Sequence, residues 1–447
     1  MRDGERAARM EARAPRGTMD ILPPESGRRR RVVEAATALF RAYGYREIEV
    51  PVFEHTEVFA RGIGEGTDIV QKEMFTFTDK GGRSLTLRPE ATAGVARAFV
   101  QHRMDASGLP VKLYYQGPMF RHERPQAGRF RQFGQLGVEL IGSALPGCDA
   151  EVIALCAHCL ESLGVRTELV INSVGEGECR AAYAAALAAY LDKDREGLCE
   201  DCRRRARTNP LRVLDCKVER CSRVIAEAPE LEGYLCQACR EHLAAVEELL
   251  AAAGVAFRRD GRLVRGLDYY TRTVFEFRDP ELGAQNALAA GGRYDRLVEE
   301  LGGRPTPAVG FSIGLERVML AGAEAGEEEE RGVFVLAIGA EARVKAFSLA
   351  QELRKAGLPA DLDHLGRSPK AQMREADREG FRLVAIVGEE EMAGGFVTLR
   401  DLEAGAQERV EEERLPRTVR ERMRGGSGPG GGRPGGMEVT DGTELSP

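Results

Sequence analysis

Apolar and polar positions alternate most clearly between residues 111 and 141. Val111–Met119 is rich in β-forming side chains, and Phe133–Ile141 alternates so that successive positions form two distinct faces. One face carries Leu136, Val138 and Leu140, and the other carries Gln135, Gly137 and Glu139. The segment between the two runs contains Gly and Pro, so the sequence predicts an antiparallel hairpin whose apolar back packs on a core.

The loop of this predicted hairpin is strongly basic. It carries His122, Glu123 and Gln126 together with four arginines, Arg121, Arg124, Arg129 and Arg131. Arginines beside an amide and a carboxylate suit a small zwitterion and a polyphosphate, because guanidinium groups fork onto phosphate oxygens. The composition alone is equally compatible with a solvated surface hairpin.

Helical and strand patterns follow one another along the rest of the first 325 residues. Towards the N-terminus, helical spacing predicts a helix at Arg28–Tyr43, and alternation predicts strands at Tyr45–Phe53, Met74–Asp79 and Ser84–Leu87. A second helix opens at the string RPEAT. Further on, the patterns predict a helix at Cys148–Leu163, a strand at Glu168–Ile171, a helix at Arg180–Leu191, strand chemistry within Arg262–Phe277, and a strand followed by a helix in Ala308–Leu320.

Beyond an acidic linker at Ala325–Glu330, strands and helices alternate as far as Asp401. The predicted strands are Val333–Ile338, Pro359–Leu362, Leu383–Val387 and Phe396–Asp401, and the predicted helices are Val344–Ala356 and Ser368–Glu379. This order is typical of a small α/β domain with βαβ crossovers. Residues 424–447 are rich in Gly and Pro and are expected to be disordered, and residues 1–14 are expected to form a flexible extension.

Composition narrows the class of protein without identifying it. The chain has 447 residues, of which 43% are hydrophobic and 30% charged, so we expect an ordinary globular protein of two or three domains. No apolar run predicts a transmembrane helix or a signal peptide, and the cytoplasm is the expected compartment. With a net charge of −7, any binding of nucleic acid must depend on local basic patches.

Six of the ten cysteines fall between residues 199 and 239. Two C-x-x-C pairs, Cys199 with Cys202 and Cys236 with Cys239, suit a structural Zn²⁺ ion, because each short turn presents two thiolates. The six candidates include Cys216 and Cys221, so the ligand set stays open, and reduced thiols that merely pack are the alternative. A further C-x-x-C pair, Cys156 with Cys159, lies in a helical apolar pattern and is expected in the core.

Several strings resemble those of the class II aminoacyl-tRNA synthetases in their histidyl form. FRHERPQAGRFRQFGQLGVELIG resembles motif 2, and RPEAT and LVRGLDYYTRTVFEF resemble signatures of the histidyl enzymes. AAGGRYDRL resembles the family's next block, and AVGFSIGLERVML resembles motif 3. GRSPKAQMREADREG resembles the anticodon-binding domain that the histidyl, threonyl, prolyl and glycyl enzymes share. The resemblance covers roughly residues 15–420, with the motifs in the family's order.

The resemblance implies a two-step reaction. The carboxylate of L-histidine attacks the α-phosphate of ATP, with Mg²⁺ on the phosphates, and the 3′-terminal ribose of histidine tRNA then attacks the adenylate, so that AMP and pyrophosphate are released. It implies that Arg121 and Arg265 are catalytic at the α-phosphate and that Arg317 binds the γ-phosphate. Histidine would contact Glu90, Ala91, Thr92, Gln135, Glu139, Tyr269 and Tyr270, and Arg124 and Gln126 would contact the acceptor end of the tRNA. Independently of the resemblance, the two C-x-x-C pairs give Cys199, Cys202, Cys236 and Cys239 as the expected ligands of a structural zinc ion.

The resemblance also implies a fold class and a domain order. We expect an α/β chain whose α+β catalytic domain is an antiparallel sheet with flanking helices, with a mostly helical Cys-rich insertion and a C-terminal α/β anticodon-binding domain. The catalytic domain would comprise residues 15–174 and 246–325, the insertion 175–245 and the anticodon-binding domain 331–423. A homodimer with no membrane attachment is the expected assembly.

Three other functions remain open. A catalytically inactive synthetase paralogue, the regulatory subunit of ATP phosphoribosyltransferase, shares the fold but lacks the C-terminal domain and usually part of the Arg/Glu set. A prolyl or threonyl synthetase would lack LVRGLDYYTRTVFEF. A zinc-dependent enzyme centred on the cysteines would need a substrate-binding constellation beside them, and the sequence shows none.

Overall fold

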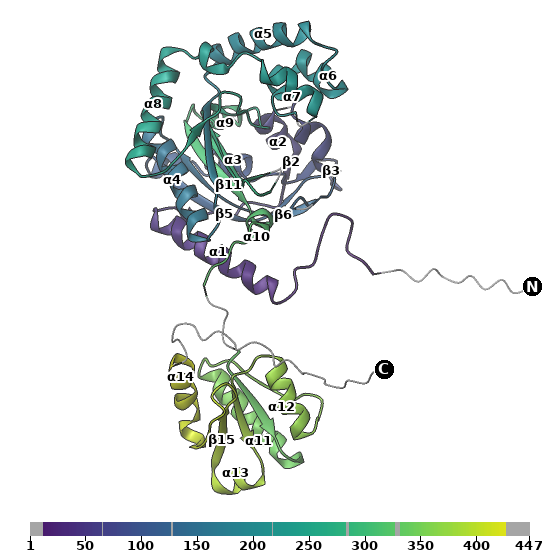
Figure 1. Cartoon of the computed structure of the whole chain (residues 1–447), viewed down its shortest axis with the longest axis vertical. Coiled ribbons are helices and arrows are strands. Elements are labelled where there is room, and N and C mark those ends of the chain that lie inside the picture. The colour runs from purple at the N-terminus through teal and green to yellow at the C-terminus, as the bar shows by residue number, and fades with distance from the viewer. Residues whose placement is uncertain are drawn as a thin grey trace, which may run out of the picture. The chain divides into compact units, whose positions relative to one another are not determined.

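The computed structural model describes residues 12–425, apart from residues 65, 127, 217, 283–285 and 327–330. Most of the predicted N-terminal extension, most of the acidic linker and nearly all of the Gly-rich tail therefore lie outside the described residues. The chain divides into two compact units at Gly326 (Figure 1). Among the described residues, no helix is long and apolar enough to cross a membrane.

An eight-stranded sheet forms the centre of the first unit (Figure 1). Its six central strands are antiparallel, and a short strand pairs in parallel at each edge. In spatial order the strands are β1 (Arg46–Glu47), β5 (Val111–Phe120), β6 (Gln132–Ile141), β11 (Ala308–Gly314), β10 (Ala287–Arg293), β9 (Thr271–Arg278), β7 (Glu168–Ser173) and β8 (Arg258–Arg259). The predicted hairpin is confirmed as β5 and β6, and the expected antiparallel sheet with flanking helices is confirmed with it.

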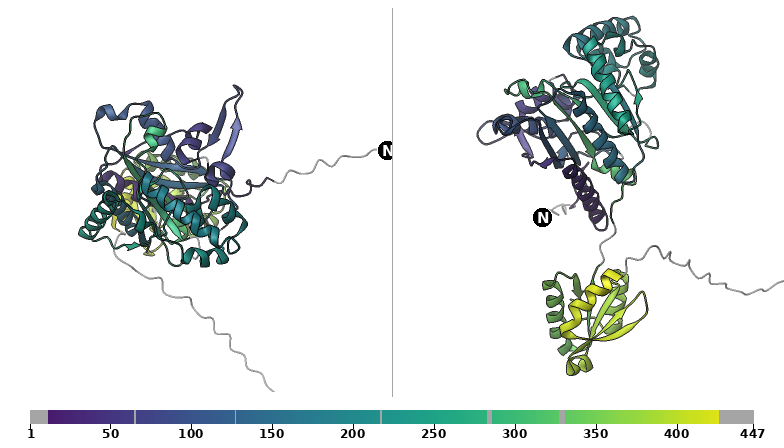
Figure 2. Two further views of the ribbon diagram at one scale, coloured as in Figure 1. Left: turned by 90° about the horizontal axis from the view of Figure 1, so that it is seen from above. Right: turned by 90° about the vertical axis from the view of Figure 1, so that its left-hand side faces the viewer.

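Three helices cover one face of this sheet (Figures 1 and 2). They are α1 (Glu25–Ala42), α4 (Pro146–Ser162) and α8 (Gln237–Ala252). The apolar face of β6 (Leu136, Val138 and Leu140) packs beneath them in one continuous core, because alternate positions of a strand face the same side. Cys156 and Cys159 are fully buried in that core, as their helical apolar pattern predicted.

A three-stranded sheet lies beside the large one and consists of β2 (Phe53–His55), β4 (Ser84–Leu87) and β3 (Phe75–Thr78). The prediction of a single strand over Tyr45–Phe53 is wrong. The chain leaves the large sheet after β1 and joins the small one at β2, and Pro51 lies between them, where its missing N–H could not serve a ladder. The short helices α2 (Thr56–Ile63), η1 (Ile69–Glu73) and α3 (Thr92–Gln101) complete this region, with η2 (Met104–Ser107) leading into β5.

A helical insert follows β7 and precedes β8, as expected for the Cys-rich segment. It contains α5 (Gly177–Lys193), α6 (Glu200–Thr208), η3 (Pro210–Val213), α7 (Glu219–Ala226) and η4 (Leu231–Tyr234), and it ends with α8. Two short helices, α9 (Leu297–Glu300) and α10 (Leu315–Leu320), flank β11. The insert shares one core cluster with the face of the large sheet opposite to α1 and α4.

The second unit is a five-stranded mixed sheet in the order β13-β12-β14-β15-β16. Its strands are β13 (Ala360–Leu362), β12 (Val333–Ala337), β14 (Leu383–Val387), β15 (Phe396–Asp401) and β16 (Gln407–Glu411), and its helices are α11 (Ala340–Lys355), α12 (Pro369–Arg378), α13 (Glu389–Gly394) and α14 (Leu415–Gly425), with a short η6 (Glu412–Arg414). The parallel pairing of β13, β12 and β14 confirms the βαβ crossovers. The sequence did not predict β16 or α14.

Candidate active site

A small cavity of about 150 Å³ opens over the polar face of β6. It is lined by the ends of several elements that are far apart in the sequence. Its polar lining residues include Glu90, Thr92, Tyr115, Arg121, Gln135, Arg265, Tyr269, Tyr270 and Tyr294. Gly310 of β11 lies opposite Glu139, and a Cβ atom at Gly310 would lie 1.9 Å from a Glu139 carboxylate oxygen, so only glycine fits beside that side chain.

Glu90 holds the entrance to α3. Its carboxylate accepts hydrogen bonds from the backbone N–H groups of Thr92 at 2.6 Å and Ala93 at 2.9 Å, so it caps the helix. Burial raises the pKa of Glu90, and these hydrogen bonds oppose that shift only in part. Among the described residues, Glu90 makes no ion pair, and the charge of Arg121, which lines the same cavity, offsets the effect of burial only in part.

Glu139 is a second buried carboxylate, with 1% of its surface exposed. It accepts hydrogen bonds from the hydroxyl of Thr92 at 2.7 Å and from the hydroxyl of Tyr294. Burial raises the pKa of Glu139 to about 8, because neither hydroxyl supplies a positive charge. Glu139 does not line the cavity itself, but both of its partners do.

The remaining polar groups of the small cavity are only partly satisfied. The side-chain oxygen of Gln135 is buried and has no hydrogen-bond partner among the described residues. The rings of Tyr269 and Tyr270 lie in a tilted contact with a centroid distance of 4.7 Å, and Tyr294 meets Tyr269 edge-on at 5.5 Å. A buried acceptor without a donor is unfavourable unless a ligand supplies one, so this cavity fits a ligand with an N–H group.

A larger cavity of about 600 Å³ adjoins the first and shares Arg121, Gln135 and Arg265 with it. It is rich in charged side chains. Its lining also includes Arg129, Arg205, Arg212, Arg262, Arg278 and Arg317, together with seven Asp and Glu residues. The arginines suit a polyanion.

Local contacts hold Arg121 and Arg265, which line both cavities, and Arg317 of the larger cavity in position. Arg121 donates from Nε to the Pro89 carbonyl at 2.8 Å, and its guanidinium lies 5.3 Å from the centre of the Phe133 ring. Arg265 donates to the Glu276 carboxylate, and Arg317 donates to the carbonyl of Ala287. Burial, followed by the nearby charge of Arg129, lowers the pKa of Arg317, so an anion placed there would relieve an unfavourable environment.

The structure brings together most of the residues that the sequence singled out. Glu90, Thr92, Gln135, Tyr269 and Tyr270 line the small cavity, Arg317 lines the large one, and Arg121 and Arg265 line both. Ala91 is buried at the start of α3. Arg124 and Gln126 are exposed on the loop between β5 and β6 and line neither cavity.

Two tyrosines of the small cavity were missed. Tyr294 lies in the string AAGGRYDRL, in which no single residue was assigned a role, and Tyr115 lies in the first strand of the hairpin. Tyr115 alternates with Tyr114 across β5, and period-2 alternation with Glu139 on the neighbouring strand could have indicated which of the two faces the cavity.

The predicted metal ligands do not come together. Cys199 and Cys202 cluster with Cys216 and Cys221, whereas Cys236 and Cys239 cluster with Cys179. The prediction of one site made of both C-x-x-C pairs is therefore corrected, because α6 folds against the turn before α7 and α8 begins beside α5.

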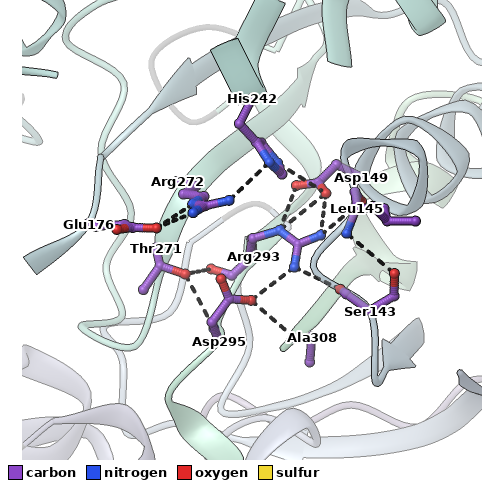
Figure 3. A network of polar contacts seen from close by, with 10 residues as sticks. All are labelled: Ser143, Leu145, Asp149, Glu176, His242, Thr271, Arg272, Arg293, Asp295 and Ala308. Carbon is purple, nitrogen blue, oxygen red and sulfur yellow. Dashed lines mark hydrogen bonds and ion pairs between the residues drawn. The ribbon is translucent and has the colours of Figure 1, made fainter. Parts of the chain in front are cut away.

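A separate polar network ties the sheet to its helices (Figure 3). The fully buried Arg293 of β10 donates to both carboxylate oxygens of Asp149 on α4, and to Asp295 at 2.9 Å. His242 of α8 lies 3.4 Å from Asp149 and 3.2 Å from Arg272. Arg272 lies two positions after Tyr270 in the sequence. Burial tends to raise the pKa of Asp149, but hydrogen bonds from His242 and Arg293 hold it below its usual range. Ion pairs within this network neutralise Arg293, Asp149 and Asp295.

Two family models match the chain. The model described as histidyl-tRNA synthetase matches residues 17–318, and the model described as anticodon binding domain matches residues 332–422. The first match spans all of the residues that line the two cavities.

Relatives and a solved structure agree with these matches. The histidine–tRNA ligase of Moorella thermoacetica is 52% identical over 401 residues, covering 89% of this chain and 95% of that protein. The histidine–tRNA ligase of Halothermothrix orenii is 50% identical over 403 residues, covering 89% of this chain and 96% of that protein. The crystal structure of apo S. aureus histidyl-tRNA synthetase superposes with a TM-score of 0.77 at 37% identity, covering 92% of this chain and 100% of the other.

Proposed function

Since the chain belongs to the histidyl-tRNA synthetase family, we propose that its small cavity binds histidine and its larger cavity binds ATP. The two substrates would react beside Arg121 and Arg265, which line both cavities. The chain is an aminoacyl-tRNA synthetase that charges tRNA with histidine, and enzymes of this class use ATP and Mg²⁺. No finding favours the regulatory paralogue. The proposal concerns which residues carry each part of the reaction.

The small cavity is the histidine site in this proposal. The carboxylate of Glu90, the amide oxygen of Gln135 and the hydroxyl of Thr92 accept hydrogen bonds from the α-ammonium group. Glu139 and Tyr270 bind the two imidazole nitrogens, and Tyr269 forms part of the wall. The buried Ala91, between Glu90 and Thr92, belongs to the same site. The observation that carries this assignment is the pair of buried carboxylates without a cation, beside a buried amide oxygen without a donor. A cationic ammonium and an N–H of the ring supply what these groups lack.

The larger cavity is the ATP site. Arg121 and Arg265 flank the α-phosphate, where they stabilise the charge that develops as the histidine carboxylate attacks, and Arg317 binds the γ-phosphate. The histidine carboxylate is already a nucleophile, so the first step needs charge and in-line placement but no general base. Glu276 pairs with Arg265, and Glu123 pairs with Arg129 at 2.8 Å, so both arginines are held at the wall of this cavity.

Mg²⁺ fits the same cavity. Glu123 and Glu276 are oxygen donors of the type that this ion prefers, and both line the wall. These two carboxylates would hold the ion, which supplies positive charge to the phosphates when it is bound.

The second step places tRNA at the basic loop. Arg124 and Gln126 would contact its acceptor end. Both are exposed on the same loop as Arg121, which lines both cavities, and neither of them lines a cavity. The family match at residues 332–422 supports an anticodon-binding role for residues 331–423.

We also propose a catalytic domain formed by residues 15–174 and 246–325, with an insertion at residues 175–245 that holds a structural zinc ion. The proposed assembly is a homodimer, and the proposed location is the cytoplasm.

Histidine-dependent exchange between ATP and pyrophosphate tests the proposal. We expect exchange with histidine but not with proline or threonine, and a loss of at least about 10²-fold in Arg265→Ala, because a preorganised charge at the reacting centre is removed. Arg258→Ala is the matched control, since Arg258 lies on the exposed edge strand β8 and pairs only with Glu168 among the described residues. A folded, histidine-binding protein without exchange would contradict the proposal and favour the regulatory paralogue.

A further inference from the structure

Four cysteines of the insert surround one point. The sulfur atoms of Cys199, Cys202, Cys216 and Cys221 all lie within 4.8 Å of one another, and those of Cys199 and Cys216 are 3.9 Å apart. A tetrahedral zinc ion with Zn–S bonds of about 2.3 Å separates its sulfurs by about 3.8 Å. A disulfide would bring two of them to about 2.05 Å. The observed spacing therefore matches shared coordination better than oxidised pairs.

The backbone around the cluster is arranged to receive thiolates. Cys199 caps the N-terminus of α6 and accepts from the N–H of Cys202 at 3.4 Å, and Cys221, in the first turn of α7, accepts from the N–H of Cys199 at 3.1 Å. Helix N-termini and N–H donors favour negative sulfur. Cys202 and Cys221 are fully buried, and they belong to the same apolar core cluster as Leu198, Leu211 and Val213.

We propose that Cys199, Cys202, Cys216 and Cys221 bind one structural Zn²⁺ ion that fixes the insert against the ATP cavity. The helices it joins, α6 and α7, have only 9 and 8 residues. Helices this short are marginal unless tertiary contacts or a ligand hold them. The ion links the beginnings of both and closes the loop between them.

The closed loop carries residues of the larger cavity. Arg205, Arg212 and Asp215 lie between the first and last cysteines of the cluster, and all three line that cavity. Arg205 donates to Asp68 at 2.5 Å, and Arg212 donates to Asp215 at 2.6 Å. Loss of the ion would release these side chains from the wall. The ligand assignment stands on its own geometry, whereas the effect on ATP rests on the proposed function.

The remaining cysteines of the insert form an incomplete group. Cys179, Cys236 and Cys239 lie together, with the sulfurs of Cys179 and Cys239 at 4.0 Å. Among the described residues no fourth Cys, His, Asp or Glu joins them at the same spacing. A closed structural zinc site takes four protein ligands, so we assign no ion to this group.

Metal analysis of cysteine variants tests the assignment. The purified protein, expressed with zinc in the medium, should hold about one Zn²⁺ per chain. Cys216→Ser and Cys221→Ser should lose most of it, and Cys236→Ser should retain it. Zinc retained in the first two variants but lost in Cys236→Ser would overturn this ligand set. The readout is metal content, so it is independent of whether the chain activates histidine.

A second measurement needs no variant and therefore covers the case in which the serine variants fail to fold. Removing zinc from the wild-type protein with a chelator should raise the number of thiols that react with a thiol reagent by about four, and Co²⁺ added back should give the absorption of a tetrahedral thiolate complex. The KM for ATP should rise on zinc removal, with less change in the KM for histidine. A protein without zinc that cannot be reconstituted, whether its thiols are all reduced or are paired as disulfides, would overturn the proposal.

Discussion

Buried acidic residues lie on both faces of the eight-stranded sheet, and they differ in the groups that surround their carboxylates. Asp149 is fully buried, but Arg293 and His242 surround it, and its pKa is held below its usual range against the effect of burial (Figure 3). Glu90 and Glu139 are buried to a similar degree, yet hydroxyl and backbone N–H groups are their hydrogen-bond donors, and burial raises the pKa of both.

The presence or absence of an internal counterion distinguishes buried acidic residues that stabilise the fold from those that bind a ligand. A buried charge with its counterion inside the protein is complete and mainly holds elements together. A buried carboxylate without a cation is unfavourable in the free protein, and a cationic ligand relieves that penalty. Histidine carries such a cation, so in our proposal Glu90 and Glu139 bind the substrate, whereas Asp149 stabilises the fold.

The largest expected effect is on the scaffold side. Asp149→Asn leaves the guanidinium of Arg293 buried with less negative charge around it, and breaking a buried pair typically lowers the free energy of unfolding by about 3–5 kcal/mol. Urea denaturation followed by a signal of the first unit measures this change. The folded variant should still bind histidine with near wild-type affinity, and a large loss of affinity would break the comparison.

Glu90→Gln gives the opposite pattern. A hydrogen bond to a charged group contributes about 1.5–3 kcal/mol, so the dissociation constant for histidine should rise about 10- to 100-fold. The free energy of unfolding should change little, because the amide oxygen can still accept from the N–H of Thr92 or Ala93 while an unpaired buried charge is removed. Calorimetric titration with histidine, together with urea denaturation, checks both halves.

The pH dependence of stability sharpens the comparison further. The pKa of Glu139 is raised from 4.5 to about 8 on folding, so the folded protein binds the proton more tightly than the unfolded chain. Its carboxyl therefore destabilises the ligand-free fold increasingly as pH rises from about 5 to about 8. Glu139→Gln should gain stability relative to wild type over that range by at least about 1.4 kcal/mol, the equivalent of one pKa unit. A difference that is constant with pH would contradict the raised pKa.

The smallest effect is expected for Tyr294→Phe. The change removes one donor to Glu139 while the ring remains packed against Tyr269. A single hydrogen bond of this type contributes about 1 kcal/mol, so the KM for histidine in the exchange reaction should rise a few-fold. Tyr114→Phe is a matched control, because Tyr114 lies on the opposite face of β5 in the core with α1; an equal effect of both changes would argue against a role for Tyr294 at the site.

Local pattern was enough for most elements of the fold. The hairpin β5–β6, strand β4 and the strand-to-helix segment β11–α10 follow directly from alternation and helical spacing. Two of the elements that were missed carry weak patterns. In β16 only Val410 is buried, and in α14 only Leu415 and Val419 are, so neither has an apolar face that a sequence window detects.

The site was predicted through resemblance to a family more than through pattern. That Glu139 faces Gly310 depends on the register of two strands separated by more than 150 residues, which no local signal contains. The prediction that Cys199, Cys202, Cys236 and Cys239 form one site was wrong for the same reason. Short spacing predicts which two thiols share a turn, but the choice of partner turn depends on how α6, α7 and α8 fold back on α5.

Histidine affinity measured side by side in Glu90→Gln and Asp149→Asn tests the central claim most directly. At a temperature where both variants are folded, titration calorimetry should show a dissociation constant raised about 10- to 100-fold in Glu90→Gln and close to wild type in Asp149→Asn. Equal losses in the two variants, or a loss only in Asp149→Asn, would contradict the claim that the carboxylates without a cation mark the histidine site.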